Sequence, residues 1–223
     1  GWIADAMAEM AGDDRLAVVC GRRREIRPEA SVWNRLIDRE WDTPVGEARA
    51  CGGDALMRRA AFDEVGGFNP AVIAGEEPEL CVRLRAAGWR IRRIDAEMTL
   101  HDAEILRFGQ WWRRAVRAGY AFALGAALHG APPERHYVPS YRRAVVWGLA
   151  LPAVILSLLV TLGPVSLALA LAYPAQVVRL ARRDGDVAHA CFTVLGRFAE
   201  GIGVLRFWRD RALGRQAAII EYK

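Results

Sequence analysis

An uncharged apolar run from Ala144 to Leu162 constrains the fold of this chain more than any other feature. The run is 19 residues long, and at about 1.5 Å per helical residue it covers roughly 28 Å, close to the hydrocarbon thickness of a bilayer. Gly163 and Pro164 then predict a turn, and a second, shorter apolar run continues to Arg179. We therefore expect a transmembrane helical hairpin over residues 141–183. A fully buried hairpin in a soluble protein is the alternative.

Arginines flank this hairpin at both ends. Arg142 and Arg143 precede it, and Arg179, Arg182 and Arg183 follow it. Loops rich in Lys and Arg stay on the cytoplasmic side of a membrane. We therefore expect both ends of the hairpin to lie on that side.

Amphipathic segments are expected on either side of the hairpin. Over residues 103–140 we expect a basic interfacial helix and a loop, with Ile105, Phe108, Trp112, Ala115, Gly119 and Phe122 on an apolar face and Arg107, Arg114 and Arg117 on another. The alternative is a helix that packs on its own domain with a solvated arginine face. Over residues 184–223 we expect a C-terminal amphipathic helix, from Val187 to Leu213, that lies along the interface.

Composition narrows the class of protein and of partner. The chain has 223 residues, 53% hydrophobic content and a net charge of +5, so it is not a disordered tail. The positive charge suits nucleic acid, anionic lipid or a phosphorylated substrate, and because arginines flank the apolar runs we expect membrane lipids and no nucleic acid. The cysteines lack metal-binding spacing, so we expect buried, reduced thiols at Cys20, Cys51, Cys81 and Cys191.

Residues 1–102 read as a mixed α/β region. The apolar run in "RLAVVCGRR" predicts a buried strand, and the alternation in "WRIRRIDAEMTLHD" predicts a strand at a sheet edge. A short helix is expected from Arg59 to Val65, ending at Gly66 and Gly67. The N-terminal stretch "GWIADAMAEM" lacks the basic region of a signal peptide, and the absence of an initiator Met suggests that the chain begins partway through a longer protein.

Three acids cluster where a loop becomes a helix, in "GEEPELCVRLRAAGW". Pro78 suits a first helical turn, so Glu76 or Glu77 is expected to begin the helix, where its dipole favours carboxylates. We expect the acids to face away from the packed core, with Glu79 a capping or structural acid. The alternative is that all three acids only complement the helix dipole.

The order of these motifs resembles the inverting GT-A glycosyltransferases of family 2, over about residues 1–101. The segments that carry the resemblance are "GGDALMRRAAFDEVGGFN", "GEEPELCVRLRAAGW" and "MTLHDA". The resemblance implies an α/β, Rossmann-like GT-A domain and transfer of a sugar from a nucleotide-diphosphate sugar to a hydroxyl acceptor. It implies that Glu77, where relatives more often have Asp, is the general base, and that Glu76 helps to hold the acceptor.

The resemblance implies further site residues. Gly52, Gly53 and Asp54 match the segment that lines the sugar site, and His101 matches a residue that completes the metal site or contacts the diphosphate. "QWWRR" resembles part of the QxxRW motif of processive members, which implies substrate contacts for Gln110 and Arg113. Arg114 stands where that motif has Trp, which counts against processive synthesis. An arginine face at the interface is the alternative for Arg113.

The resemblance covers only part of the family's pattern. No Asp-x-Asp motif and no nucleotide-binding βαβ unit precede these motifs, so we expect residues 1–102 to be the acceptor-side part of the domain. A divalent metal, Mg²⁺ or Mn²⁺, is implied, with its remaining ligands in the N-terminal part that the chain lacks. The implied partners are a nucleotide-sugar donor and a carbohydrate or lipid-linked acceptor.

The expected location is the cell membrane, with the catalytic part facing the cytoplasm. Two other functions remain open: a non-catalytic, membrane-anchored remnant or scaffold, and a processive polysaccharide synthase.

Overall fold

The computed structural model describes residues 1–215 and 221. The chain divides into two compact units, the first from Gly1 to Arg107 and the second beginning at Phe108. The division falls at the residue before a long helix begins, five positions after the boundary expected at residue 102.

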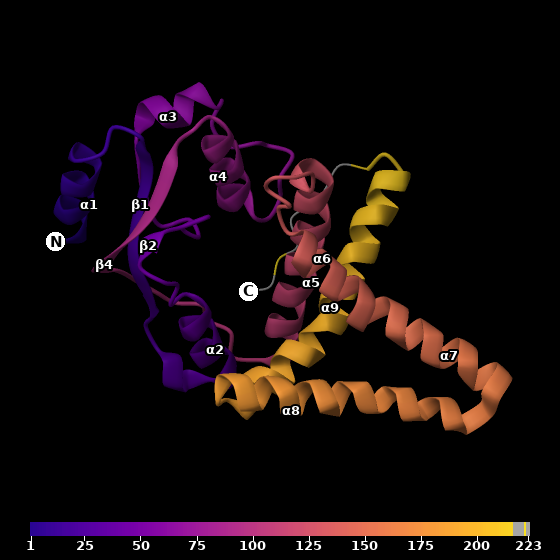
Figure 1. Ribbon diagram of the computed structural model, residues 1–223. Helices are drawn as coiled ribbons and strands as arrows, with labels where there is room; N and C mark the ends of the chain where they lie inside the picture. Colours follow the sequence, from indigo (N-terminus) through magenta and orange to yellow (C-terminus); the bar gives the residue numbers. More distant parts are fainter. Residues whose placement is uncertain (216–220, 222–223) are drawn as a thin grey trace. The chain divides into compact units, whose positions relative to one another are not determined.

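The first unit is a mixed α/β fold (Figure 1). Its elements are α1 (Trp2–Ala11), β1 (Leu16–Glu25), a 3-10 turn η1 (Pro28–Ala30), α2 (Val32–Glu40), β2 (Gly46–Glu47), β3 (Leu56–Met57), α3 (Arg59–Glu64), α4 (Glu76–Ala86) and β4 (Arg90–His101). Among the described residues the four strands form one sheet in the order β2-β4-β1-β3. β1 and β4 are parallel, while β2 and β3 are antiparallel to their neighbours.

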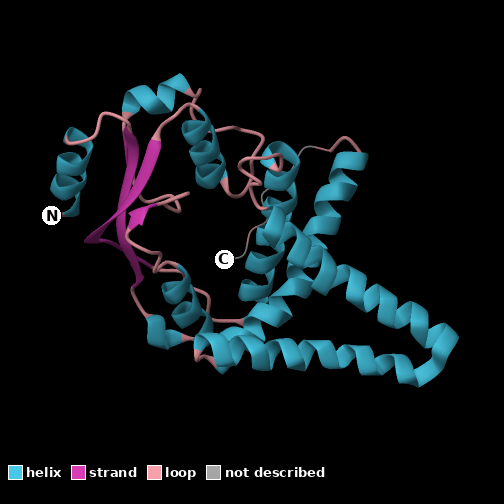
Figure 2. Ribbon diagram, viewed as in Figure 1, coloured by secondary structure: helices cyan, strands magenta, loops and turns pink. Residues whose placement is uncertain are grey.

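Apolar side chains on both faces of β1 explain this arrangement. On one face Val18 packs with Leu80, Leu84 and Ile91. On the opposite face Leu16 and Val19 pack with Ala6 of α1 and with Ile94. Figure 2 shows α1 and α4 on opposite sides of the sheet. Because each face of the sheet is covered, residues 16–21 of β1 form a continuous buried apolar run, as expected for a strand of a parallel pair.

The strand at residues 90–101 does not lie at the sheet edge. β4 pairs with β1 along one side, and Gly46 and Glu47 of β2 pair with Arg93 and Arg92 on its other side. The edge prediction is therefore wrong, because alternation shows only that a strand is half buried. The strands at residues 16–25 and 90–101 and the helices beginning at Arg59 and Glu76 are confirmed.

The second unit is helical. Its elements are α5 (Phe108–His129), α6 (Val138–Val145), a π-helical turn η2 (Val146–Ala150), α7 (Leu151–Leu162), a 3-10 segment η3 (Gly163–Leu171), α8 (Ala172–Asp184) and α9 (Val187–Ala212). The chain reverses direction between α7 and α8 (Figure 1). Gly163, with φ of 69°, occupies the start of this turn, so the turn expected at Gly163 and Pro164 is confirmed.

One segment of the described residues is long and apolar enough to cross a membrane. It covers Val138–Asp184, and its most apolar window has a mean hydropathy of 2.4 with 11% of its residues buried. Large apolar side chains on both arms are exposed, among them Leu156, Val160, Val165 and Leu171. Exposed apolar surface of this extent is typical of a face that meets lipid or another protein.

Helix α5 packs against α9. Trp111, Val116 and Tyr120 are buried on α5, whereas Phe108 is exposed. The apolar face expected for this segment is therefore shifted, since Trp111 and not Trp112 is buried, and Ile105 lies before the helix in the first unit. These contacts favour the packed helix over the interfacial one.

Candidate functional site

Glu77 occupies the first turn of α4 and holds a distant loop. Gly75 precedes the helix in the left-handed region, with φ of 78°, and Pro78 fits the first turn, where no backbone N–H is needed. The Glu77 carboxylate accepts hydrogen bonds from the backbone N–H groups of Cys51, 2.9 Å from Oε1, and Gly52, 2.8 Å from Oε2. Its Oε1 also lies 3.0 Å from the Cys81 thiol.

Glu77 is only 3% exposed. The expectation that these acids face away from the core is therefore wrong for Glu77, and also for Glu79, which is 2% exposed. The physical reason is that each buried carboxylate has a partner: loop N–H groups for Glu77 and the Arg83 guanidinium for Glu79. Glu76 is exposed.

The loop that Glu77 holds contains the two predicted glycines. Gly52 and Gly53 have φ of 86° and 106°, values that side chains other than glycine rarely adopt. A Cβ on Gly52 would lie 2.6 Å from Nη2 of Arg23. Both glycines are exposed. The loop thus presents bare backbone at the surface, in a conformation that requires glycine.

Arg23 joins the glycine loop to the strands. Its Nη2 donates to the Gly52 carbonyl at 2.8 Å, and its Nη1 lies 3.6 Å from Oδ2 of Asp54. The same Asp54 oxygen accepts a hydrogen bond from Thr99 Oγ1 at 2.9 Å. Arg23 and Thr99 are direct partners in the β1–β4 register. Neighbouring strands therefore fix Asp54 from two sides.

His101 ends β4 and is exposed. Its ring and the Trp41 ring form a T-shaped pair, with the ring centroids 5.3 Å apart and the planes at 77°. The guanidinium of Arg23 lies 4.5 Å from the centroid of the same Trp41 ring, a distance suited to a cation–π contact. Trp41 thus connects His101 to the arginine that holds Gly52.

Glu79 has a structural partner. It forms an ion pair with Arg83 one turn later, at 2.7 Å, and Arg83 also donates to the carbonyl of Val65 at 2.5 Å. The pair therefore ties the loop after α3 to α4. This arrangement agrees with the structural role expected for Glu79.

The predicted site residues fall into both units. Glu77, Gly52, Gly53, Asp54 and His101 are joined, directly or through Arg23 and Trp41, by contacts within the first unit. Gln110 and Arg113 lie on α5 in the second unit, where Gln110 is half-buried and Arg113 is exposed.

Among residues 1–215 and 221, no group of three or more His, Cys, Asp or Glu side chains is placed to hold a metal ion. His101 packs on an aromatic ring, and the Asp54 carboxylate bonds to Thr99. The described residues by themselves do not form the implied Mg²⁺ or Mn²⁺ site.

The thiols beside Glu77 are free and hard to ionise. All four cysteines are free, as expected, but only Cys20 and Cys81 are buried as predicted, since Cys51 is half-buried and Cys191 is exposed. Burial raises the pKa of Cys81, and the nearby Glu77 carboxylate raises it further. The hydrogen bond with Cys20 raises the pKa of Cys51, and burial adds to this effect. The thiols are therefore poor nucleophiles.

Sequence reasoning missed Arg23, Trp41 and Thr99. Arg23 and Thr99 lie within predicted strands, so their pairing follows from the strand register once β1 and β4 are placed side by side. Trp41 follows α2 in a segment without a motif, and nothing in the sequence indicated its contact with His101.

No protein-family model matches the chain, and no curated protein matches it. The resemblance to family 2 glycosyltransferases therefore depends on the quoted motifs.

Proposed function

We propose that the chain is the acceptor side of a membrane-associated glycosyltransferase of the family 2 type. The reaction is transfer of a sugar from a nucleotide-diphosphate sugar to a hydroxyl acceptor, with inversion at the anomeric carbon. The nucleotide-binding half of the domain lies outside this chain in the proposal. The proposed location is the cell membrane, with the catalytic part facing the cytoplasm.

One observation carries the proposal. The Glu77 carboxylate binds the backbone of Cys51 and Gly52, although these residues lie 26 and 25 positions away in the sequence. The two segments that carry the resemblance are thereby joined at one place. The segments that this contact joins also contain exposed residues, namely Gly52, Gly53 and Glu76. The Glu76 carboxylate and the backbone of the two glycines are therefore accessible to a sugar substrate.

In this proposal Glu77 remains the predicted general base, and Glu76 holds the acceptor. The acceptor oxygen attacks the anomeric carbon as the diphosphate leaves, and its proton passes to the base. Oε1 accepts two hydrogen bonds, from the Cys51 N–H and the Cys81 thiol, whereas Oε2 accepts only the one from the Gly52 N–H and retains a further lone pair for the acceptor proton. Since Glu77 is nearly buried, proton transfer requires the Cys51–Gly53 loop to move aside.

The remaining residues receive supporting roles. The glycine loop and Asp54 line the sugar site, and Arg23 fixes both by its contacts with Gly52 and Asp54. A divalent metal would stabilise the leaving diphosphate, with His101 as one ligand and the remaining ligands outside this chain. Arg113 and Gln110 are proposed to contact substrate.

The test uses the full-length protein, in membranes or neutral detergent. Nucleotide release is measured with a panel of nucleotide sugars, an added hydroxyl acceptor and Mg²⁺ or Mn²⁺. We expect release that depends on one donor and on the metal, and a product whose anomeric configuration is inverted. Release from no donor on the panel, or retention of configuration, would contradict the proposal.

The burial of Glu77 favours a second candidate, a non-catalytic membrane-anchored scaffold. In that case the carboxylate serves only to hold the loop. The sequence upstream of Gly1 separates the two, since a catalytic protein requires a nucleotide-binding unit there. A scaffold would also retain all its properties when Glu76, the exposed acid, becomes Gln.

A further inference from the structure

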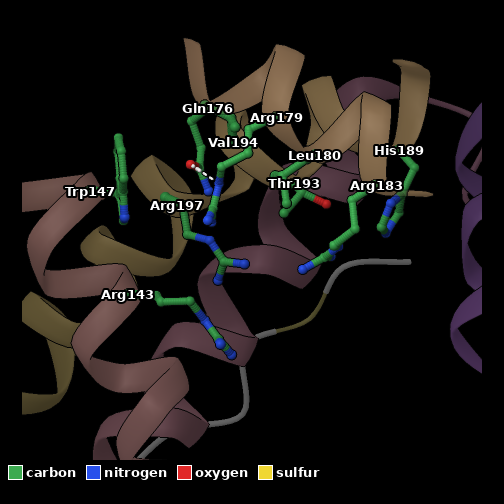
Figure 3. Close-up of a pocket in the computed structure, with 10 residues that line it drawn as sticks. All are labelled: Arg143, Trp147, Gln176, Arg179, Leu180, Arg183, His189, Thr193, Val194 and Arg197. Atoms are coloured by element: carbon green, nitrogen blue, oxygen red, sulfur yellow. Dashed lines mark hydrogen bonds between the residues drawn. The ribbon is translucent and has the colours of Figure 1, made fainter. Parts of the chain in front are cut away.

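A pocket of about 350 Å³ lies in the second unit, between α6 with its π-helical turn, α8 and the start of α9. Figure 3 shows arginine side chains from all three segments at this pocket. Its polar lining comprises Arg143, Gln176, Arg179, Arg183, His189, Thr193 and Arg197. None of these residues belongs to the glycosyltransferase motifs, so the pocket requires a separate explanation.

The ion pairs around the pocket leave positive charge uncompensated. Arg183 pairs with Asp184 at 2.6 Å, and Arg197 pairs with Glu200 at 2.6 Å. The other two arginines bond to neutral groups: Arg143 donates to Ser140 Oγ at 3.1 Å, and Arg179 donates to Gln176 Oε1 at 3.1 Å. Four guanidinium groups thus face two carboxylates, which leaves two positive charges. His189 is the other titratable residue that lines the pocket, and its Nδ1 lies 3.5 Å from Oδ2 of Asp184.

The outer arginines are accessible to a ligand. Arg143, Arg179 and Arg183 are exposed, and Arg197 is half-buried. Guanidinium groups match the oxygens of a phosphate in geometry and remain charged. A phosphate monoester carries a charge of about −1.5 to −2 at neutral pH, which balances the two unpaired charges. A carboxylate or a phosphate diester would leave one of them uncompensated.

The position of the pocket at the base of the apolar hairpin further restricts the kind of ligand that it can bind. Arg143 directly precedes the uncharged run, while Arg179 and Arg183 follow the second run. Trp147 lines the pocket, and its carbonyl accepts a hydrogen bond from Tyr173 at 2.9 Å. Trp and Tyr gather at the interface between a bilayer and water. Leu156 and Val160 are exposed along the adjoining arm, where acyl chains would pack.

We propose that this pocket binds the headgroup of a lipid that carries a terminal phosphate monoester. The arginines hold the phosphate at the level of the interface, and the acyl chains lie along the exposed arms of the hairpin. Basic pockets between helices on the cytoplasmic side of a membrane are known to hold lipid headgroups. The inference does not depend on the proposed sugar transfer, because no residue of the Glu77 site takes part.

The test measures binding by the full chain in neutral detergent micelles. The probes are phosphatidate, oleate at equal micelle charge, and inorganic phosphate. We expect phosphatidate to bind with micromolar affinity or better, in preference to both other probes. Equal binding of oleate would show that the protein responds only to the negative charge of the micelle surface. Equal binding of inorganic phosphate would show that the lipid part does not contribute to binding. Either result, or no binding of phosphatidate, would overturn the proposal.

Neighbouring arginines provide matched variants. Arg183→Gln removes a lining guanidinium, whereas Arg182→Gln removes an equally charged, exposed neighbour that does not line the pocket. We expect the first variant to weaken phosphatidate binding roughly tenfold, the size of a lost hydrogen bond to a charged group, and the second to leave it unchanged. Arg143→Gln gives an independent repeat from another helix. Equal losses in Arg182→Gln and Arg183→Gln would overturn the proposal.

Discussion

At the residue scale, Glu77 contacts both the backbone of the glycine loop and a buried thiol. Its two oxygens bind the backbone of the glycine loop, and one of them lies beside the Cys81 thiol. Hydrogen bonds to a charged group contribute about 1.5–3 kcal/mol each to stability. The loop conformation therefore depends on the same carboxylate that the proposed reaction uses, so variants of Glu77 need a readout of loop structure as well as of activity.

Thiol reactivity provides that readout. Raised pKa values and burial should protect Cys51 and Cys81 from a maleimide at pH 8, while exposed Cys191 reacts at once. The label at each cysteine is measured by peptide mass spectrometry, first in the native state and then in denaturant. Labelling of Cys81 as fast as Cys191 in the native protein would contradict the contacts described for Glu77.

Alkaline pH should weaken the fold through Cys81. Its folded-state pKa lies above the ordinary value of 9.0 because of burial and of Glu77. The unfolded chain therefore loses this proton first, so the stability from the neutral thiol is complete below pH 9 and declines as the pH rises further. Denaturant unfolding between pH 8 and 10.5 should show a shallower decline in Cys81→Ala than in the Cys191→Ala control. Equal slopes in the two variants would refute this coupling.

At the element scale, glycines determine how the helices of the second unit pack. A Cβ on Gly203 of α9 would lie 2.1 Å from the Val116 carbonyl oxygen and 2.6 Å from the Tyr120 nitrogen, both on α5. A Cβ on Gly119 of α5 would lie 2.0 Å from the Glu200 carbonyl oxygen. The two helices thus meet backbone to backbone. Small residues allow this close approach in membrane proteins as well.

Two alanine variants of α9 test this packing. Gly203→Ala forces the backbones of α5 and α9 apart, and such overpacking lowers the free energy of unfolding by about 1–3 kcal/mol. Gly196→Ala is the control, because its Cβ would meet Trp111 at an ordinary 3.6 Å and alanine favours a helix by up to about 1 kcal/mol. We expect the melting temperature in detergent to fall for the first variant and to hold or rise for the second. Equal melting temperatures would contradict the described contact.

The elements were more predictable than their contacts. The strands at residues 16–25 and 90–101, the helix at Glu76 and the turn at Gly163 follow from local patterns, because periodicity, Pro and Gly act within a few residues. The burial of Glu77 depends on backbone groups 25 and 26 positions away, and the face of α5 depends on Gly203. Local patterns carry no information about such partners, so the acids were expected to be exposed and the buried tryptophan was assigned one position too late.

At the scale of the whole molecule, the chain combines a mixed α/β unit with a helical unit that exposes much apolar surface. The proposed membrane association explains why Leu156, Val160 and Leu171 remain uncovered by the described residues. A soluble protein would lose stability or aggregate with such a surface.

Lysine substitution tests that association. Leu156→Lys places a charge within the apolar run, where it costs about 2.5–3.5 kcal/mol in a membrane. Val178→Lys is the control, since Val178 adjoins Arg179 at the end of the second run. After alkaline carbonate extraction we expect the wild type and Val178→Lys to stay in the membrane pellet and Leu156→Lys to be released in part. Wild-type protein recovered wholly in the supernatant would contradict membrane insertion.

In the proposed reaction, Glu77 takes the acceptor proton during sugar transfer. The most direct measurement compares kcat and the donor KM of the intact wild-type protein with those of Glu77→Gln, with Cys81 labelling as the check on the loop. A general base contributes about 10²- to 10⁴-fold, so we predict a fall in kcat of at least about 100-fold with little change in donor KM and with Cys81 still protected. Full activity of Glu77→Gln would contradict the assignment of Glu77 as the general base.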